Sequence, residues 1–454
     1  LDADGKPLWI RDARGNLVMQ YIRPAKANND PSDAMSVDVV PGYDIAGNLL
    51  FQHSMDSGDR WMINDAAGKP FYAWDENDRI TEGGDSVMEQ RVYHTTYDAL
   101  HRPLAQRMQI NAGAWQVTER FVYGETHPDA EARNLRGQGY QHYDASGLIT
   151  NQRYDFKGSL QEATRQLVRA YNVLVVDWSV GSPTAELEEV TFTQRTEYDA
   201  LNRMTRMENW HLAGRAAAIY TPQYNPRGML SGETLTVRGE ATQAILNIEY
   251  DAKGQRSRIQ YGNGTTTRYV YDPLTYRLIQ LCTTRTGTGG MLPSLPSNLS
   301  EPNALQNIYY TYDPVGNIAE IHDDAYEPVF FNNQRVEPRN HYTYDALHRL
   351  IVATGRENYS AEGAPSQFEA EPYTVRFPVD GNALRNYTQY YRYDGVGNIQ
   401  QMRHAANGGR WTRDYSYAPG SNRLTETRTG NQPADRIQYH YDPHGSMLNL
   451  ANVA

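Results

Sequence analysis

The hexapeptide YDALHR occurs twice, at Tyr97–Arg102 and at Tyr344–Arg349. An aspartate, a histidine and an arginine so close together could form a catalytic constellation, or each could serve the backbone geometry of a repeated turn. Related Tyr-Asp hexapeptides recur along the chain, and from Tyr198 they follow one another after 26, 26 and 21 residues. Repetition at this spacing predicts a repeat architecture, which grows along one direction instead of adding separate cores.

The units share Tyr-Asp, two variable residues, and then Gly, Asn or His at the fourth position after the Tyr. Eight units are predicted to supply the structural turn positions of the repeat. Their Tyr, Asp and fourth residue are Tyr43, Asp44 and Gly47; Tyr97, Asp98 and His101; Tyr198, Asp199 and Asn202; Tyr250, Asp251 and Gly254; Tyr312, Asp313 and Gly316; Tyr344, Asp345 and His348; Tyr393, Asp394 and Gly397; and Tyr441, Asp442 and Gly445. Further members are YDASGL at Tyr143, YDFKGS at Tyr154, YNPRGM at Tyr224 and YDPLTYR at Tyr271, with weaker relatives LDADGK at Leu1, RDARGN at Arg11, NDAAGK at Asn64 and WDENDR at Trp74.

The residue types within one unit are those of a β-hairpin. The Tyr ends a strand, the Asp accepts hydrogen bonds from backbone amides and opens a turn, and the fourth residue after the Tyr takes positive φ. Asn and His are among the few residues other than Gly that are enriched at positive φ. His101 and His348 therefore substitute for Gly in a turn, and the sequence favours this interpretation over a catalytic one.

Composition excludes several classes of protein. The net charge of −11 argues against a nucleic-acid partner, whose phosphates need Lys and Arg. A single cysteine, Cys282, excludes an internal disulfide framework and a Cys-rich zinc site. No apolar run is long enough to predict a membrane span. The mean hydropathy of −0.72 indicates too little apolar material for one compact core, while 34 Tyr and 7 Trp are too many aromatic residues for a disordered chain.

Several segments depart from the repeat. Leu160–Tyr171 has helical spacing and good helix formers, residues 172–179 look like a short buried strand, and Glu125–Arg136 could form another short helix. The whole of residues 1–454 is predicted to be one continuous repeat segment and a fragment of a longer chain, since it opens inside a motif. Insertions are expected near 124–140, 160–175, 283–305 and 358–390.

Interpretations that assign a specific chemistry to single motifs have less support from the sequence. The cluster Gly287, Gly289 and Gly290 lacks the Lys-Ser/Thr of a phosphate-binding loop, and the run His322-Asp323-Asp324 lacks a second histidine at metal-ligand spacing. The tyrosines could form a carbohydrate-binding platform, but stacking of equivalent hairpins explains them as well. We predict no catalytic residue, no cofactor and no metal.

The repeated Y-D-x-x-G-N/R-L/I units resemble the YD, or Rhs, repeats of bacterial polymorphic toxins and of teneurins, from Leu1 to Leu450. The stretches YDFKGSLQEATRQL (Tyr154–Leu167), VVDWS (Val175–Ser179) and YTYDALHRLIVATGRE (Tyr342–Glu357) look most like the B component of bacterial insecticidal Tc toxin complexes. This resemblance implies an all-β strip that spirals into a hollow shell, with a few short helices and loop insertions. The family's propeller region would precede Leu1 and its self-cleaving core would follow Ala454.

The function implied by the resemblance is structural. A shell of this kind encapsulates a cytotoxic C-terminal polypeptide, from the same chain or a partner, and shields it before translocation into a target cell. A pore-forming translocation component would bind through regions outside this chain, and the protein would be secreted or extracellular. The alternatives are a teneurin-like adhesion module that binds glycans or protein and, more distantly, a polysaccharide-active β-solenoid enzyme.

Overall fold

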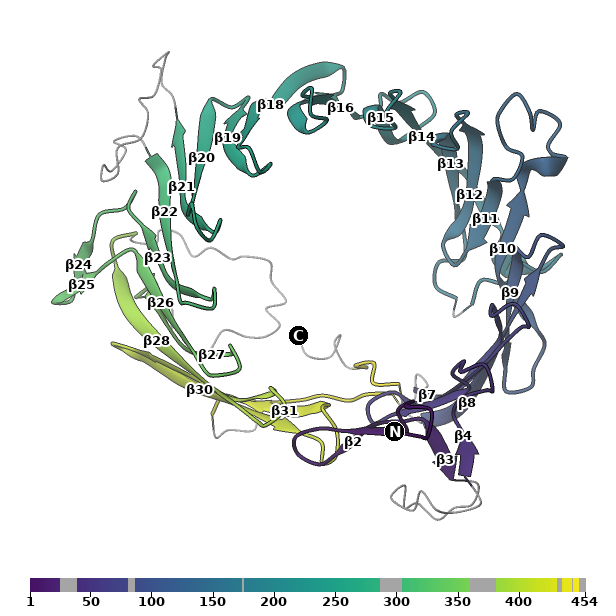
Figure 1. Cartoon of the computed structure of the whole chain (residues 1–454), viewed down its shortest axis with the longest axis horizontal. Coiled ribbons are helices and arrows are strands. Elements are labelled where there is room, and N and C mark those ends of the chain that lie inside the picture. The colour runs from purple at the N-terminus through teal and green to yellow at the C-terminus, as the bar shows by residue number, and fades with distance from the viewer. Residues whose placement is uncertain are drawn as a thin grey trace. The chain divides into compact units, whose positions relative to one another are not determined.

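A computed structural model describes residues 1–24, 39–80, 86–173, 175–285, 304–359, 381–430, 435–442 and 444–448. The chain divides into two compact units. The first comprises Leu1–Ile10 and Met19–Leu246, and the second comprises Arg11–Val18 and Asn247–Ala454. The regular secondary structure of the described residues is almost entirely β-strand, so the prediction of an all-β chain is confirmed (Figure 1).

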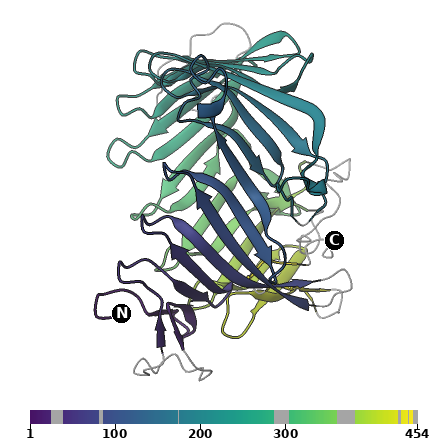
Figure 2. The ribbon, with the colours of Figure 1, turned by 90° about the vertical axis from the view of Figure 1, so that its right-hand side faces the viewer.

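The elements of the first half of the chain are β1 (Trp9–Arg11), β2 (Leu17–Gln20), β3 (Ile22–Pro24), β4 (Val39–Pro41), β5 (Phe51–Ser54), β6 (Gly58–Asn64), β7 (Pro70–Ile80), β8 (Ser86–Tyr97), β9 (Pro103–Ile110), β10 (Gln116–Tyr123), the 3-10 helix η1 (Gly124–Thr126), β11 (Gly139–Asp144), β12 (Gly147–Tyr154), β13 (Leu160–Val168), the 3-10 helix η2 (Pro183–Ala185), β14 (Leu187–Tyr198), β15 (Met204–Leu212), β16 (Ile219–Tyr224), β17 (Leu230–Val237) and β18 (Glu240–Tyr250). From β5 to β18 every strand pairs antiparallel with the next one in the sequence. Figure 2 shows these neighbours side by side.

The elements of the second half are β19 (Arg256–Tyr261), β20 (Thr265–Tyr271), β21 (Leu278–Arg285), β22 (Ala304–Tyr312), β23 (Ile318–Asp323), β24 (Val329–Phe331), β25 (Gln334–Val336), β26 (Arg339–Tyr344), β27 (Leu350–Asn358), β28 (Leu384–Tyr393), β29 (Ile399–Ala406), β30 (Gly409–Tyr417), β31 (Leu424–Arg428) and β32 (Arg436–Gln438). They form the same meander from β19 to β32, with β24 and β25 set apart as a separate two-stranded hairpin.

Buried apolar side chains are scattered along the strands, as at Met108 and Ile259, and gather only in small clusters. One contains Ala130, Leu135 and Tyr154, and another contains Val168, Val176 and Trp178. Most strand residues are half-buried on both faces of the sheet. The strands are rich in Tyr and Thr, side chains that suit a pleated, half-buried surface. The fold is therefore stabilised mainly by its backbone ladder and by contacts between neighbouring hairpins.

The expected helix over Leu160–Tyr171 is wrong. Leu160–Val168 form β13, which pairs with β12 on one side and β14 on the other, so this part is not an insertion either. Helix propensity is a weak prior, and the backbone partners offered by two neighbouring strands override it. Residues 175–178 form no strand, although Val176 and Trp178 are buried as expected.

Two further expectations need correction. Within the expected helix Glu125–Arg136 the structure has only the end of η1 followed by turns, with Leu135 fully buried. WDENDR at Trp74 is not a turn, because it lies inside β7. The insertions expected at 283–305 and 358–390 fall mostly on residues 286–303 and 360–380, which lie outside the described residues together with Gly287, Gly289 and Gly290. The flanking strands β21, β22, β27 and β28 extend into the expected ranges.

Candidate functional site

The feature that recurs through the chain is the YD turn, and both YDALHR copies have the same one. The backbone N–H of Asp98 donates to Arg102 O at 2.9 Å, and that of His101 donates to Asp98 O at 2.9 Å. Asp98 Oδ1 accepts from the N–H groups of Leu100 and Arg102, at 2.9 and 2.8 Å. This is a type I turn closed by a residue at positive φ, in which the aspartate satisfies the amides that the turn leaves unpaired.

All eight predicted units lie at such turns, and their fourth residue after the Tyr has positive φ. The values are 88° for Gly47, 63° for His101, 65° for Asn202, 87° for Gly254, 110° for Gly316, 61° for His348, 102° for Gly397 and 81° for Gly445. YDPLTYR at Tyr271 is one residue longer, and there Tyr276 takes the position at φ 60°. In YDASGL, Asp144 pairs directly with Gly147 across a shorter loop.

Tyrosines at the ends of many hairpins join their hairpin to the one before it. Ten tyrosine hydroxyls donate to a backbone carbonyl at 2.6–3.1 Å, and nine of the ten acceptors are the first residue of the strand that follows the preceding turn. The donors are Tyr43, Tyr97, Tyr123, Tyr154, Tyr224, Tyr271, Tyr312, Tyr344, Tyr393 and Tyr417. Tyr312, for example, donates to Leu278 O at 2.7 Å. A register shift precedes most of these tyrosines, as between Thr311 and Tyr312, and bulges of this kind re-aim side chains.

A basic residue at the end of one turn covers the tyrosine ring of a later unit. The cation lies 3.8–5.7 Å from the ring centre in seven pairs: Lys6 with Tyr43, Lys69 with Tyr97, Arg102 with Tyr123, Arg203 with Tyr224, Arg277 with Tyr312, Arg349 with Tyr393 and Arg423 with Tyr441. Such contacts add to the hydroxyl bond beside them. They explain why Arg or Lys so often follows the positive-φ residue.

The side chains at positive φ have a second role that the sequence did not reveal. His101 Nε2 lies 2.6 Å from Asp65 Oδ2, and His348 Nδ1 lies 3.0 Å from the amide of Asn317. Asn202 Oδ1 accepts from the hydroxyl of Ser159 at 2.9 Å. Each contact reaches the turn of another unit, which glycine cannot do. These partners meet because neighbouring units pack in one particular register, which the sequence does not show.

One turn lies beside units nearly 400 residues away in the sequence. Arg14, in the RDARGN motif, contacts its own Asp12 at 2.9 Å, Asp394 at 3.2 Å and Asn422 Oδ1 at 2.7 Å. The Asp12 and Asp394 side chains are only 8% and 9% exposed. We call this cluster of Asp12, Arg14, Asp394 and Asn422 the Arg14 joint. It fixes residues Arg11–Val18 within the second unit.

Electrostatics follow the turn geometry. The backbone amide of Arg102 and, against the opposing effect of burial, its guanidinium lower the pKa of Asp98. Hydrogen bonds from the side chain and backbone of Asn48 likewise lower the pKa of Asp44. Burial raises the pKa of ladder tyrosines such as Tyr312 and Tyr393. At neutral pH the aspartates are therefore charged acceptors and the tyrosines neutral donors, as the bonds require.

The groups that could bind a metal or act as a nucleophile can be located among the described residues. Among the described residues, no group of three or more His, Cys, Asp or Glu side chains could hold a metal ion. Asp323 accepts from the backbone amides of Asn307 and Ala325, so it closes a turn. Cys282 is buried with 6% exposure. A search of the described helices finds none long and apolar enough to cross a membrane.

Comparison with known proteins gives relatives of one kind. No protein-family model matches the chain. It is 32% identical over 405 residues to the toxin subunit YenC2 of Yersinia entomophaga, a match covering 86% of this chain and 40% of that protein. It is 29% identical over 416 residues to the toxin subunit YenC1 of the same organism, covering 89% and 39%. The chain thus spans about two fifths of the length of these relatives.

Solved structures show the same fold. A crystal structure of TcdB2-TccC3 matches with a TM-score of 0.70 and 26% identity over 97% of this chain and 22% of that one. The Tc holotoxin pore of Photorhabdus luminescens matches with a TM-score of 0.69 and 27% identity, over 92% of this chain and 19% of that one. No observation favours the adhesion or polysaccharide-active alternatives.

Proposed function

We propose that this chain, a YD-repeat (Rhs-repeat) protein of the Tc toxin B/C type, forms part of the wall of a shell that encloses a cytotoxic C-terminal polypeptide before its translocation. The observation that carries the proposal is the way the hairpins are joined. Neighbouring hairpins are linked by a backbone ladder, in ten places by a tyrosine hydroxyl, and in seven places by a cation over a tyrosine ring. A sheet joined in this way needs no continuous apolar core.

A wall of this composition suits an enclosed polypeptide. The side chains on both faces of the sheet are largely polar or half-buried, and the mean hydropathy is −0.72. Its polar side chains limit the collapse of an unfolded chain onto the wall, because that association depends on apolar area removed from water, although exposed apolar side chains such as Leu104 and Trp115 are present. The role proposed for this chain is structural, and no step of catalysis is assigned to it.

The partners follow from the same proposal. The enclosed polypeptide would come from the same chain or from a partner subunit, and a pore-forming translocation component would bind through regions outside this chain. Such a complex would be released to act on another cell, so we expect this chain to be secreted or extracellular. The sequence identity to toxin subunits over most of this chain supports this assignment.

Protease protection tests the proposal. The full-length protein would be purified with its C-terminal region and digested with trypsin in buffer and at increasing urea. We expect the C-terminal region to survive until urea opens the sheet, as followed by circular dichroism of the strands. Digestion of the C-terminal region in buffer, with the sheet intact, would contradict enclosure. Electron cryo-microscopy density showing the strands packed around a filled interior without a cavity would contradict it as well.

A further inference from the structure

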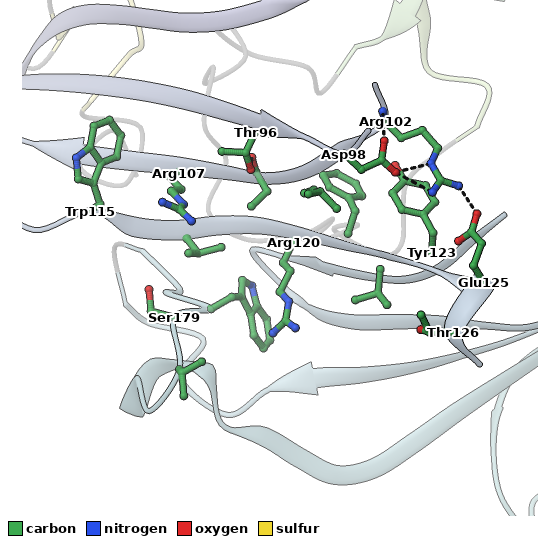
Figure 3. Close-up of a pocket in the computed structure, with 17 residues that line it drawn as sticks. Thr96, Asp98, Arg102, Arg107, Trp115, Arg120, Tyr123, Glu125, Thr126 and Ser179 are labelled. Carbon is green, nitrogen blue, oxygen red and sulfur yellow. Dashed lines mark hydrogen bonds and ion pairs between the residues drawn. The ribbon is translucent and has the colours of Figure 1, made fainter. Parts of the chain in front are cut away.

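A groove in the first unit combines apolar walls with two arginines that have no acidic partner among the described residues, one of which, Arg120, lies 5.4 Å from the centre of the Tyr143 ring (Figure 3). It has a volume of about 740 Å³ and lies along β9 and β10, with residues 178–180 on its other side. This volume falls within the roughly 300–1,000 Å³ typical of sites that hold ligands the size of a short peptide or drug.

The wall opposite the strands is held firmly. Asp177 Oδ1 accepts from the backbone N–H of Val117 at 2.8 Å, and the N–H of Trp178 donates to Val117 O at 2.8 Å. The indole N–H of Trp178 donates to Asp144 O at 3.0 Å, and its ring packs edge-on against Tyr143. Trp178 is 7% exposed. The groove is therefore preformed, which lowers the entropic cost of binding.

Two arginines in the groove have no acidic partner. At one end Arg102 is occupied by Asp98 and Glu125, at 2.7 and 2.6 Å. Arg107 and Arg120 are exposed, and neither forms an ion pair with any carboxylate in the part of the chain that the structure describes. The charge of Arg107 reaches its cross-strand neighbour His94, whose pKa is lowered first by burial and then by this arginine. The lining thus has three arginines against the two carboxylates of Asp98 and Glu125, a local positive excess in a chain of net charge −11.

The apolar lining limits the kind of anion. Leu104 and Trp115 are each 38% exposed, and Val180 is fully exposed. The lining contains no glycine, the residue around which loops cradle phosphate with backbone amides. We propose that this groove binds an extended peptide that carries both carboxylate and apolar side chains. The carboxylates would pair with Arg107 and Arg120, and the apolar side chains would cover Leu104, Trp115 and the edge of Trp178.

Fluorescence anisotropy with a labelled peptide in which Glu and Phe alternate tests this site on the full chain. The double variant Arg107→Gln/Arg120→Gln should bind at least ~10-fold more weakly at low salt, a change of about 1.4 kcal/mol in binding free energy. Its affinity should also depend less on salt, since exposed charges are screened. Arg410→Gln is the matched control, because it removes one exposed arginine from the second unit and should bind like the unchanged protein.

Three results would overturn the inference. One is unchanged affinity of the double variant when its thermal melting matches that of the unchanged protein. Another is equal binding of the peptide with Lys in place of Glu. The third is competition by polyphosphate or by a polyuronate at the same concentration as the peptide, which would assign the groove to another class of ligand. The binding assay does not require a closed shell, so failure here and failure of the proposed function are distinguishable.

Discussion

Replacing Tyr312 by phenylalanine removes one hydroxyl and keeps the ring. In the structure that hydroxyl donates to Leu278 O at 2.7 Å, and Arg277 lies 5.6 Å from the centre of the ring. A typical intramolecular hydrogen bond contributes about 0.5–1.5 kcal/mol net, and an unsatisfied buried carbonyl costs about 1–3 kcal/mol. Tyr312 and its acceptor are half-buried, so we expect a local loss of about 1–2 kcal/mol. The cation–ring contact should remain.

Hydrogen exchange followed by mass spectrometry is the suitable assay, because stability in a repeat architecture is approximately a sum of local and nearest-neighbour contributions. Amides of β21 and β22 should exchange about 10-fold faster in Tyr312→Phe, the factor that corresponds to 1.4 kcal/mol. Peptides from distant hairpins should exchange at unchanged rates. A global unfolding measurement would dilute this local change.

Tyr198→Phe is the matched control. Tyr198 occupies the equivalent position in its unit, but its hydroxyl has no hydrogen-bond partner among the described residues. Its removal should leave exchange in β14 and β15 unchanged. Equal acceleration by both substitutions would show that the hydroxyl matters for some reason other than the inter-hairpin bond. No acceleration in Tyr312→Phe would refute the reasoning directly.

Three further predictions concern the turns. His348→Val should destabilise its hairpin by about 1–2 kcal/mol, because a β-branched residue at positive φ is strained, whereas His348→Gly should change the chemical denaturation midpoint little. Cysteines introduced at Ala13 and Gly395 should form a disulfide, because a Cβ at Gly395 would lie 3.7 Å from that of Ala13. Cysteines introduced at Ala13 and Gly381 should not, because a Cβ at Gly381 would have no neighbour within 4 Å. Non-reducing electrophoresis distinguishes the two variants. The contribution of the turn aspartates to the free energy of unfolding should be complete above about pH 5 and be lost as the pH falls below about 4, because their folded pKa values lie below the unfolded value of about 3.9. In a urea titration, a loss that begins near pH 6 and exceeds the loss below pH 4 would point to histidines instead.

The turns could be inferred from sequence because their chemistry is local. The exchange of Gly for Asn202, His101 and His348 at one position identifies a backbone requirement, and six consecutive residues contain everything that the turn needs. The carbonyl that each tyrosine reaches could not be inferred, because it depends on how consecutive hairpins register against each other. The contact between His101 and Asp65 depends on the same register.

The two main errors of the sequence interpretation also have physical causes. Leu160–Val168 are good helix formers in isolation, but the backbone partners supplied by β12 and β14 decide their conformation. Trp74 begins a Tyr-Asp-like pattern, yet WDENDR has Asp78 where the turn requires Gly, Asn or His, and the segment continues as β7. The residue at the fourth position therefore identifies a turn more reliably than the aromatic-acid pair, which by itself does not distinguish a turn from a strand.

The Arg14 joint differs in kind from the bonds between consecutive hairpins. Those bonds close short loops, so little chain entropy is lost in forming each of them, whereas the joint connects residues 380 apart in sequence through few side chains. Arg14 is the cation between two carboxylates that are less than a tenth exposed. Without it those carboxylates would lie near each other with less compensation, although Asn16 and Asn398 still serve them. The ladder can thus be lengthened unit by unit at small cost, while the contact of the RDARGN turn with Asp394 and Asn422 depends on the few side chains that Arg14 brings together.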